Sequence, residues 1–253
     1  EFKNDYKIYW KNNVVGKIKK GGNYLSPEID IITDEALDDN YKKDLSNALS
    51  VWIKNLISEE LKDLTNLIKL KNKNQYLRAL AFQLYESNGV LKRDEVKDIV
   101  NLISKDDRKQ LRQLGIKIGR YHIFLPRMLK PKAVNLRISL WKFHNNIMSK
   151  NEIPKSGLNF LVDEGSNLNS NFLLLCGFEK FRNFYVRVDI LEKLFLKIIE
   201  NTKKNDFQIS SEMMNLLGST KENFYKLLDL MNYKKKSKEK DIFFYIGDKK
   251  NRK

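Results

Sequence analysis

The sequence predicts a mainly α-helical chain with small β elements, that is, an α+β fold. Three observations lead to this class. The first thirty residues form short strand-like runs broken by Asn and Gly, apolar residues recur at helical spacing from Asp39 onward, and the last third ends in a basic loop and a strand. The predicted segments, in order, are a β-hairpin or small sheet over 1–33, a helical bundle over 34–150, a linker over 151–170, a winged-helix-like module over 171–247 and a basic tail over 248–253.

The N-terminal segment is typical of a hairpin. Residues 7–10 and 14–18 are rich in β-branched and aromatic side chains, and Asn12 and Asn13 between them favour a tight turn. Gly21 and Gly22 interrupt the pattern, and 28–32 is expected to add a third strand.

Helical periodicity begins near residue 39. Expected helices cover about 39–58 with a continuation to 68, 76–84, 93–102, and a segment that begins at Ser104 and ends at Gly115. Ser104, with Asp107 three positions later, is an N-capping signature. The range 116–125 has β character, and Pro131 suits the first position of a helix over 132–145.

The C-terminal third alternates short helices and strands. Helices are expected over 171–176 and 191–198, from Ser211, and from Ser219 or Thr220, with strands over 184–188 and 242–246. Three helices followed by a basic β-wing is the order of a winged helix, a variant of the helix-turn-helix.

Charge is distributed unevenly. The chain has 48 Lys and Arg against 32 Asp and Glu, a net charge of +16. Segment 105–155 holds 13 basic and three acidic residues, segment 233–253 holds nine and three, and the remainder is almost neutral. Half of the ten arginines lie in the first block. Because Arg presents a planar fork that matches phosphate, this pattern indicates two regions of contact with nucleic acid.

The candidate contact residues come from these two blocks. Arg120 and Arg127 flank the β-like segment and are the strongest individual candidates, while Tyr121 could stack on a base and the lysines would neutralise phosphates. The full candidate set is Arg120, Tyr121, Arg127, Lys130, Lys132, Arg137, Lys234, Lys235, Lys236 and Lys238. A solvated basic loop is an equally plausible interpretation of 234–240.

Several other classes of protein are excluded or disfavoured. No run of 18 apolar residues is present, so no membrane partner is expected. The single cysteine, Cys176, suits a reducing compartment, and we expect a cytoplasmic protein. His122 and His144 have no ligand-spaced partners, and no phosphate-binding loop occurs. We therefore expect no catalytic residue, no metal site and no cofactor within this chain.

Three stretches carry a resemblance to a known family. They are Ala79 to Leu84 with Gly89 to Arg93, the block from Leu114 to Pro131, and Cys176-Gly177-Phe178 with Val186 to Glu192. Together they resemble the region after the motor in alphaproteobacterial superfamily 2 helicases, relatives of the mitochondrial-degradosome RNA helicase. The likeness covers most of residues 5–247, and Leu-Gly-x-x-x-Gly-x-x-x-x-Phe-Leu-Pro within 114–126 is its most specific part.

The resemblance implies an ATP-dependent helicase as the parent protein, with two RecA-like domains upstream in cis. ATP and Mg²⁺ would then bind only to that motor, since every ATPase motif is missing here. On this basis we expect an accessory region that binds nucleic acid, RNA in preference to DNA. The alternatives are a protein–protein interaction module that docks on a motor or another partner, and a free-standing winged-helix nucleic-acid binder.

Overall fold

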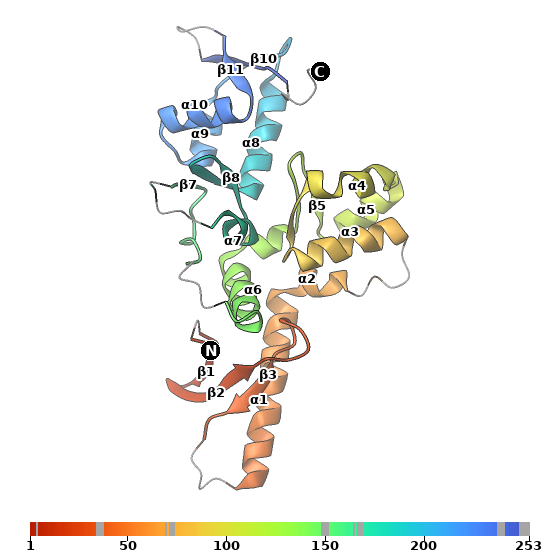
Figure 1. The fold of residues 1–253 in the computed structure, drawn as a ribbon, viewed down its shortest axis with the longest axis vertical. Coiled ribbons are helices and arrows are strands. Elements are labelled where there is room, and N and C mark those ends of the chain that lie inside the picture. The colour runs from red at the N-terminus through yellow and green to blue at the C-terminus, as the bar shows by residue number, and fades with distance from the viewer. Residues whose placement is uncertain are drawn as a thin grey trace. The chain divides into compact units, whose positions relative to one another are not determined.

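The computed structural model describes residues 1–3, 5–33, 38–68, 70, 74–147, 152–163, 165, 169–236 and 241–247. Within these residues, α-helices combine with small three-stranded sheets, which confirms the predicted mixture of α and β structure (Figure 1). The chain divides into two compact units. Unit 1 comprises Glu1–Leu91, Glu95–Lys117 and Ile123–Ile153, and unit 2 comprises Lys92–Asp94, Ile118–His122 and Pro154–Lys253.

Unit 1 begins with an antiparallel sheet of order β1-β2-β3, with β1 at Lys7–Trp10, β2 at Asn13–Lys19 and β3 at Glu28–Ile31. The predicted hairpin is confirmed, with its turn one residue earlier than expected. Lys11 and Asn12 both have positive φ, at 46° and 69°. Two consecutive residues of this kind make a two-residue hairpin loop whose twist matches the strands.

The first helices of unit 1 follow the predicted periodicity. The first, α1 (Asp39–Glu60), begins at Asp38, whose side chain accepts the Asn40 N–H at 3.0 Å. It ends at the buried Leu61, and α2 (Lys62–Leu67) continues the chain. Next, α3 (Gln75–Glu86) is capped by Asn74. Helix α1 packs against β3 and α6 (Pro131–His144), so that this sheet and the long helix share one core.

The segment after α3 contains more strand than expected. Strand β4 (Val90–Lys92) leads to a single 3₁₀ turn, η1 (Arg93–Val96), and then to α4 (Lys97–Leu102). The one helix predicted over 93–102 is thus split, because Val96 leaves helical geometry at φ −123° and ψ 22°. Helix α5 (Lys105–Gln113) follows, then β5 (Lys117–Ile118), β6 (His122–Phe124) and the 3₁₀ turn η2 (Pro126–Leu129), and the three strands form a sheet of order β4-β6-β5.

Unit 2 contains a sheet of order β7-β9-β8, with strands β7 (Phe160–Val162), β8 (Phe178–Phe181) and β9 (Phe184–Arg187). Helix α7 (Ser170–Leu175) precedes β8. The predicted linker therefore includes a strand, since Phe160 pairs with Val186 and Val162 with Phe184. The residues 151, 164 and 166–168 of that range lie outside the described residues, as does the predicted tail over 248–253.

The rest of unit 2 is helical with a second sheet. Its elements are α8 (Val188–Asn201), β10 (Asp206–Gln208), α9 (Ser211–Leu217), α10 (Lys221–Leu230), β11 (Tyr233–Lys235) and β12 (Ile242–Tyr245). The sheet is antiparallel with the order β10-β12-β11. Leu191, Leu194, Phe224 and Phe243 belong to one buried cluster that joins the helices to this sheet.

One order of elements occurs twice along the chain. The first series is α3, β4, α4, α5, β5, β6, and the second is α8, β10, α9, α10, β11, β12. In each series the first strand neighbours the third, and the third neighbours the second. Thr220 caps α10 as Ser104 caps α5, so the third helix begins with a hydroxyl cap in both series.

The role of Ser104 as the N-terminal cap of α5 can be tested by mutation. Ser104 Oγ accepts the Asp107 N–H at 3.1 Å and donates to the Asp107 carboxylate at 2.8 Å. We expect Ser104→Ala to lower the free energy of unfolding by about 1 kcal/mol. Urea unfolding followed by tryptophan fluorescence measures this, because Trp10, Trp52 and Trp141 all lie in unit 1.

Ser50→Ala is the matched control. Ser50 is exposed within α1, where alanine has the higher helix propensity, so no loss is expected. An equal loss in both variants would show that the hydroxyl of Ser104 is not a cap.

Candidate nucleic-acid interface

A loop of unit 2, residues 119–122, carries the strongest predicted contact residue and is held by one carboxylate. Glu192 on α8 accepts the backbone N–H groups of Arg120 at 2.6 Å, Tyr121 at 2.8 Å and His122 at 2.8 Å. Three successive N–H groups that converge on one anion fix the backbone of the loop. Gly119 is required beside them, since a Cβ there would lie 2.3 Å from Glu192 Cδ.

Beside this loop lies a network of buried charges, also within unit 2. His122 Nε2 lies 2.8 Å from Glu179 Oε2, and its Nδ1 lies 3.6 Å from Glu192 Oε1. Lys92 Nζ donates to Glu179 Oε1 at 2.8 Å, and Arg93 Nη1 donates to the Gly119 carbonyl at 2.8 Å. The network therefore ties Lys92 and Arg93, the loop, and strand β8 to one another.

The pKa values follow from this geometry. Burial alone would lower the pKa of His122, but the carboxylates of Glu179 and Glu192 outweigh it, so the pKa lies above its ordinary value. Burial would raise the pKa of Glu179 and of Glu192. The hydrogen bonds from His122, from Lys92 and from the loop N–H groups reverse this, and both pKa values are lowered. The network is consequently most stable with all its members charged.

The loop presents one cation at the surface. Arg120 is exposed, and its guanidinium carbon lies 6.0 Å from the centre of the Phe195 ring. Tyr121 is half-buried: its ring packs edge-on against Phe195 at 5.6 Å and against the core of unit 2. The phenol is therefore mainly a packing group, and burial raises its pKa.

Strand β11, which carries part of the second basic block, contributes Tyr233 to the cluster against which Tyr121 packs. Burial and the neighbouring Tyr245 raise the pKa of Tyr233 to about 12, whereas the charge of Arg120 acts to lower it. The ring centres of Tyr233 and Tyr245 are 5.3 Å apart, and Tyr245 is 44% exposed. The loop and β11 thus share one apolar cluster, in which Tyr121 packs near Tyr233, although some 110 residues separate them in sequence.

Each predicted lysine of this block that the structure describes is paired with a carboxylate. Lys234 pairs with Asp229, and Lys236 with Asp206. Lys235 Nζ lies 3.0 Å from Asp241, which also pairs with Lys221. Lys234 and Lys235 belong to strand β11 and not to a loop as expected, because they pair with Phe244 and Phe243 of β12. Lys238 lies outside the described residues.

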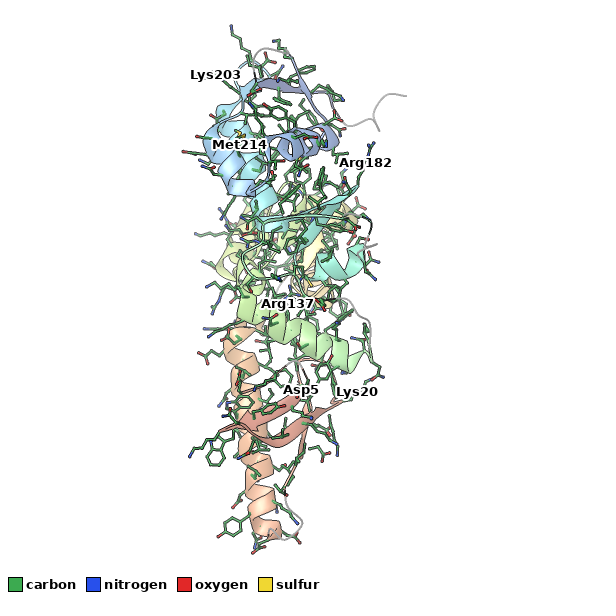
Figure 2. The ribbon with its side chains drawn as sticks, turned by 90° about the vertical axis from the view of Figure 1, so that its left-hand side faces the viewer. Asp5, Lys20, Arg137, Arg182, Lys203 and Met214 are labelled. Carbon is green, nitrogen blue, oxygen red and sulfur yellow. The ribbon has the colours of Figure 1, made fainter. Side chains whose placement is uncertain are left out.

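A further arginine of unit 2 adjoins this region. Arg182 lies in the β8–β9 turn at φ 51°, is exposed, and extends away from the ribbon in Figure 2. Together with Lys234, Asn232 and Asp229 it lines a shallow hollow of about 380 Å³. Sequence reasoning overlooked Arg182, since it stands alone in a nearly neutral segment.

The remaining candidates lie in unit 1. Arg127 is half-exposed, and its Nη1 lies 3.5 Å from Asp63 Oδ1. Lys130 and Lys132 are exposed at the start of α6, with no ion pair among the described residues.

The prediction that Arg137 contacts nucleic acid is wrong. It is fully buried on α6, where Nε donates to the Met128 carbonyl at 3.2 Å (Figure 2). Because α6 is buried on most of its circumference, Arg137 is a group of the interior and not a surface contact.

Comparisons with known proteins add no relative: no family model, no curated protein and no solved structure matches this chain. In the described part of the chain, no group of three or more His, Cys, Asp or Glu residues is arranged to hold a metal ion. No helix there is both long enough and apolar enough to cross a bilayer.

Removing the charge of Glu192 tests the loop anchor. We expect Glu192→Gln to lower the free energy of unfolding by roughly 2–4 kcal/mol, because three N–H groups and His122 lose a buried anionic partner. Urea unfolding by circular dichroism measures the loss, and hydrogen exchange at residues 120–122 should become faster. Glu200→Gln, exposed on the same helix, should change neither measurement. Unchanged exchange in Glu192→Gln would contradict the anchor.

The network also predicts a pH dependence. Since the pKa of folded His122 lies above the ordinary value of about 6.5, its stabilisation is complete below that pH and is lost as the pH rises through the folded pKa. The lowered pKa values of Glu179 and Glu192 matter at acidic pH, where their contribution to the free energy of unfolding is lost as the pH falls below about 4. Between about pH 6 and pH 9, the free energy of unfolding should therefore decline.

His122→Gln should flatten that decline in urea unfolding measured across the same pH range. His144→Gln, which alters the other histidine of the chain, should keep it. The same slope in His122→Gln and wild type would assign the decline to another group.

Proposed function

We propose that this chain is a cytoplasmic, RNA-binding accessory region of an ATP-dependent helicase, without a motor of its own. The observation that carries the proposal is an apolar cluster shared by the loop of residues 119–122 and strand β11 in unit 2. Tyr121, next to Arg120 of the first block, packs against the buried cluster that includes Tyr233 of β11, the strand that carries Lys234 and Lys235 of the second block. An anionic chain that follows this surface could meet cations from both blocks.

The topology of unit 2 supports a winged-helix-like module as the scaffold. Three helices, α8, α9 and α10, alternate with strands in winged-helix order, and β10-β12-β11 is the sheet order of that fold. The third helix is poorly suited to enter a groove, because Lys221 is paired with Asp241 and Lys226 with Glu222. Contact through the wing strands and the loop is therefore the better-supported mode.

The chemistry at this surface suits contacts with the RNA backbone. The guanidinium of Arg120 is exposed, and Glu192 holds the backbone of its loop, so the loop needs no ordering when Arg120 binds phosphate. The lysines of β11 are in exposed ion pairs, which contribute about 0–1 kcal/mol each, and a phosphate can replace the carboxylate at little cost. The exposed ring of Tyr245 offers a surface for base stacking.

Within this proposal, ATP and Mg²⁺ bind only to motor domains in cis, upstream of this chain. None of the residues named above would bind ATP or Mg²⁺. The accessory region would hold the strand while the motor moves along it.

One observation favours the alternative of a protein–protein interaction module. Several large apolar side chains in the near-neutral part of unit 1 are exposed, including Tyr41 at 67%, Phe82 at 60% and Leu102 at 56%. Exposed apolar groups of this size are common at protein interfaces. This function and RNA binding use different surfaces, so the measurement below separates them.

Fluorescence anisotropy with a labelled single-stranded RNA tests the proposal. Arg120→Ala combined with Arg182→Ala should weaken binding and reduce the slope of log affinity against log salt by about 1.4, at about 0.7 for each lost phosphate contact. Lys43→Ala with Lys54→Ala removes the same charge from exposed positions of α1, which carries none of the candidate contacts, so binding should be unchanged. If wild type binds no RNA, or binds it independently of salt, the interaction module becomes the better account.

A further inference from the structure

The third helix of the first α-β-α-α-β-β series differs in charge from its counterpart in unit 2. On α5, Lys105, Lys109 and Arg112 are all exposed, at positions i, i+4 and i+7. This spacing aligns them along one face, over about 10 Å at 1.5 Å per residue. We call these three residues the α5 basic face.

Asp106, an exposed carboxylate of the same helix, forms no ion pair with the α5 basic face in the described part of the chain. Among the described residues none of its three side chains forms an ion pair, and Arg112 uses only Nε, in a 3.4 Å hydrogen bond to the Arg108 carbonyl. The nearby Asp107 is buried and engaged by Ser104 and by Asn74 at 3.2 Å. On α10, in contrast, both lysines are paired with acidic side chains.

The placement of Lys105 and Lys109 is unfavourable for the helix itself, whereas Arg112 lies in the last turn, where the helix dipole favours a cation. Lys105 occupies the first turn, where the helix dipole disfavours positive charge. Lys105 and Lys109 are like charges at i and i+4, which destabilise a helix by about 0.2–0.5 kcal/mol. An anion bound along this face would relieve both effects.

The other basic residue of α5 has a structural role. Arg108 is half-buried, and its Nη2 donates to the Val100 carbonyl at 3.1 Å, which anchors α5 to α4. Of the four basic residues of α5, Arg108 therefore packs against α4, and the three residues of the α5 basic face are exposed to solvent.

We propose that the α5 basic face binds the phosphate backbone of RNA, as a second contact separate from the Arg120 surface. The proposal rests on the proposed function in taking RNA as the ligand. Contact with the backbone alone is expected, because the face consists of two lysines and one arginine and has no aromatic side chain on which a base could stack. Binding through this face should therefore be independent of sequence.

The test compares four forms of the full chain by anisotropy with one labelled single-stranded RNA. They are wild type, Lys105→Ala/Lys109→Ala/Arg112→Ala, the Arg120→Ala/Arg182→Ala pair, and a control, Lys43→Ala/Lys54→Ala/Lys62→Ala. The control removes three exposed cations from α1 and α2 of the same unit. The α5 variant should bind about tenfold more weakly and lose about 2 from the salt slope, at about 0.7 per contact, while the control keeps both values. Circular dichroism should show every variant folded, since the changes lie at the surface.

The outcomes separate the two proposals. A loss confined to the Arg120 pair overturns the α5 basic face and leaves the proposed function in place. A loss in the α5 variant but not in the Arg120 pair supports the face and removes the Arg120 surface. Equal losses in the α5 variant and its control assign the effect to net charge and overturn the face, and absence of binding by wild type overturns both proposals.

Discussion

The carboxylate of Glu192 is the interaction on which the arrangement of unit 2 depends. A buried carboxylate is costly unless it is hydrogen-bonded, and here three consecutive backbone N–H groups and the nearby His122 compensate for its lost hydration. The bonds join helix α8 to a loop about 70 residues earlier in the chain. The position of the Arg120 backbone follows from that one anchor.

The same principle explains how the chain manages its positive charge. In unit 2 the cations of α10 and β11 are balanced by nearby carboxylates such as Asp229 and Asp241, so the local structure is close to neutral. In the described part of unit 1, Lys105, Lys109 and Arg112 of α5 form no such ion pair. The net charge of +16 therefore includes two kinds of cation. Some are paired with carboxylates of the protein, and others are available to bind an external anion.

Much of the fold could be predicted from local patterns. The hairpin, the helices of unit 1 and the caps at Ser104 and Thr220 depend on residues close in sequence. Strands β8, β10 and β11 were not predicted, because each has only three or four residues, which is too short to show a clear alternation of apolar and polar side chains. The role of Glu192 in holding the loop was not predicted either, since in sequence Glu192 looks like any acidic residue near the start of a helix. Arg137 was misplaced because burial of a whole helix is not visible in its own sequence.

Unit 2 is not one continuous stretch of sequence. A fragment that began at Pro154 would lack residues 92–94 and 118–122, and with them every loop N–H that Glu192 accepts. The carboxylate would then be left buried without donors, and the apolar surface that Tyr121 covers would meet water. The C-terminal third alone therefore lacks part of the contacts of unit 2. Exchange of this unit between proteins would require all three of its segments to be transferred together.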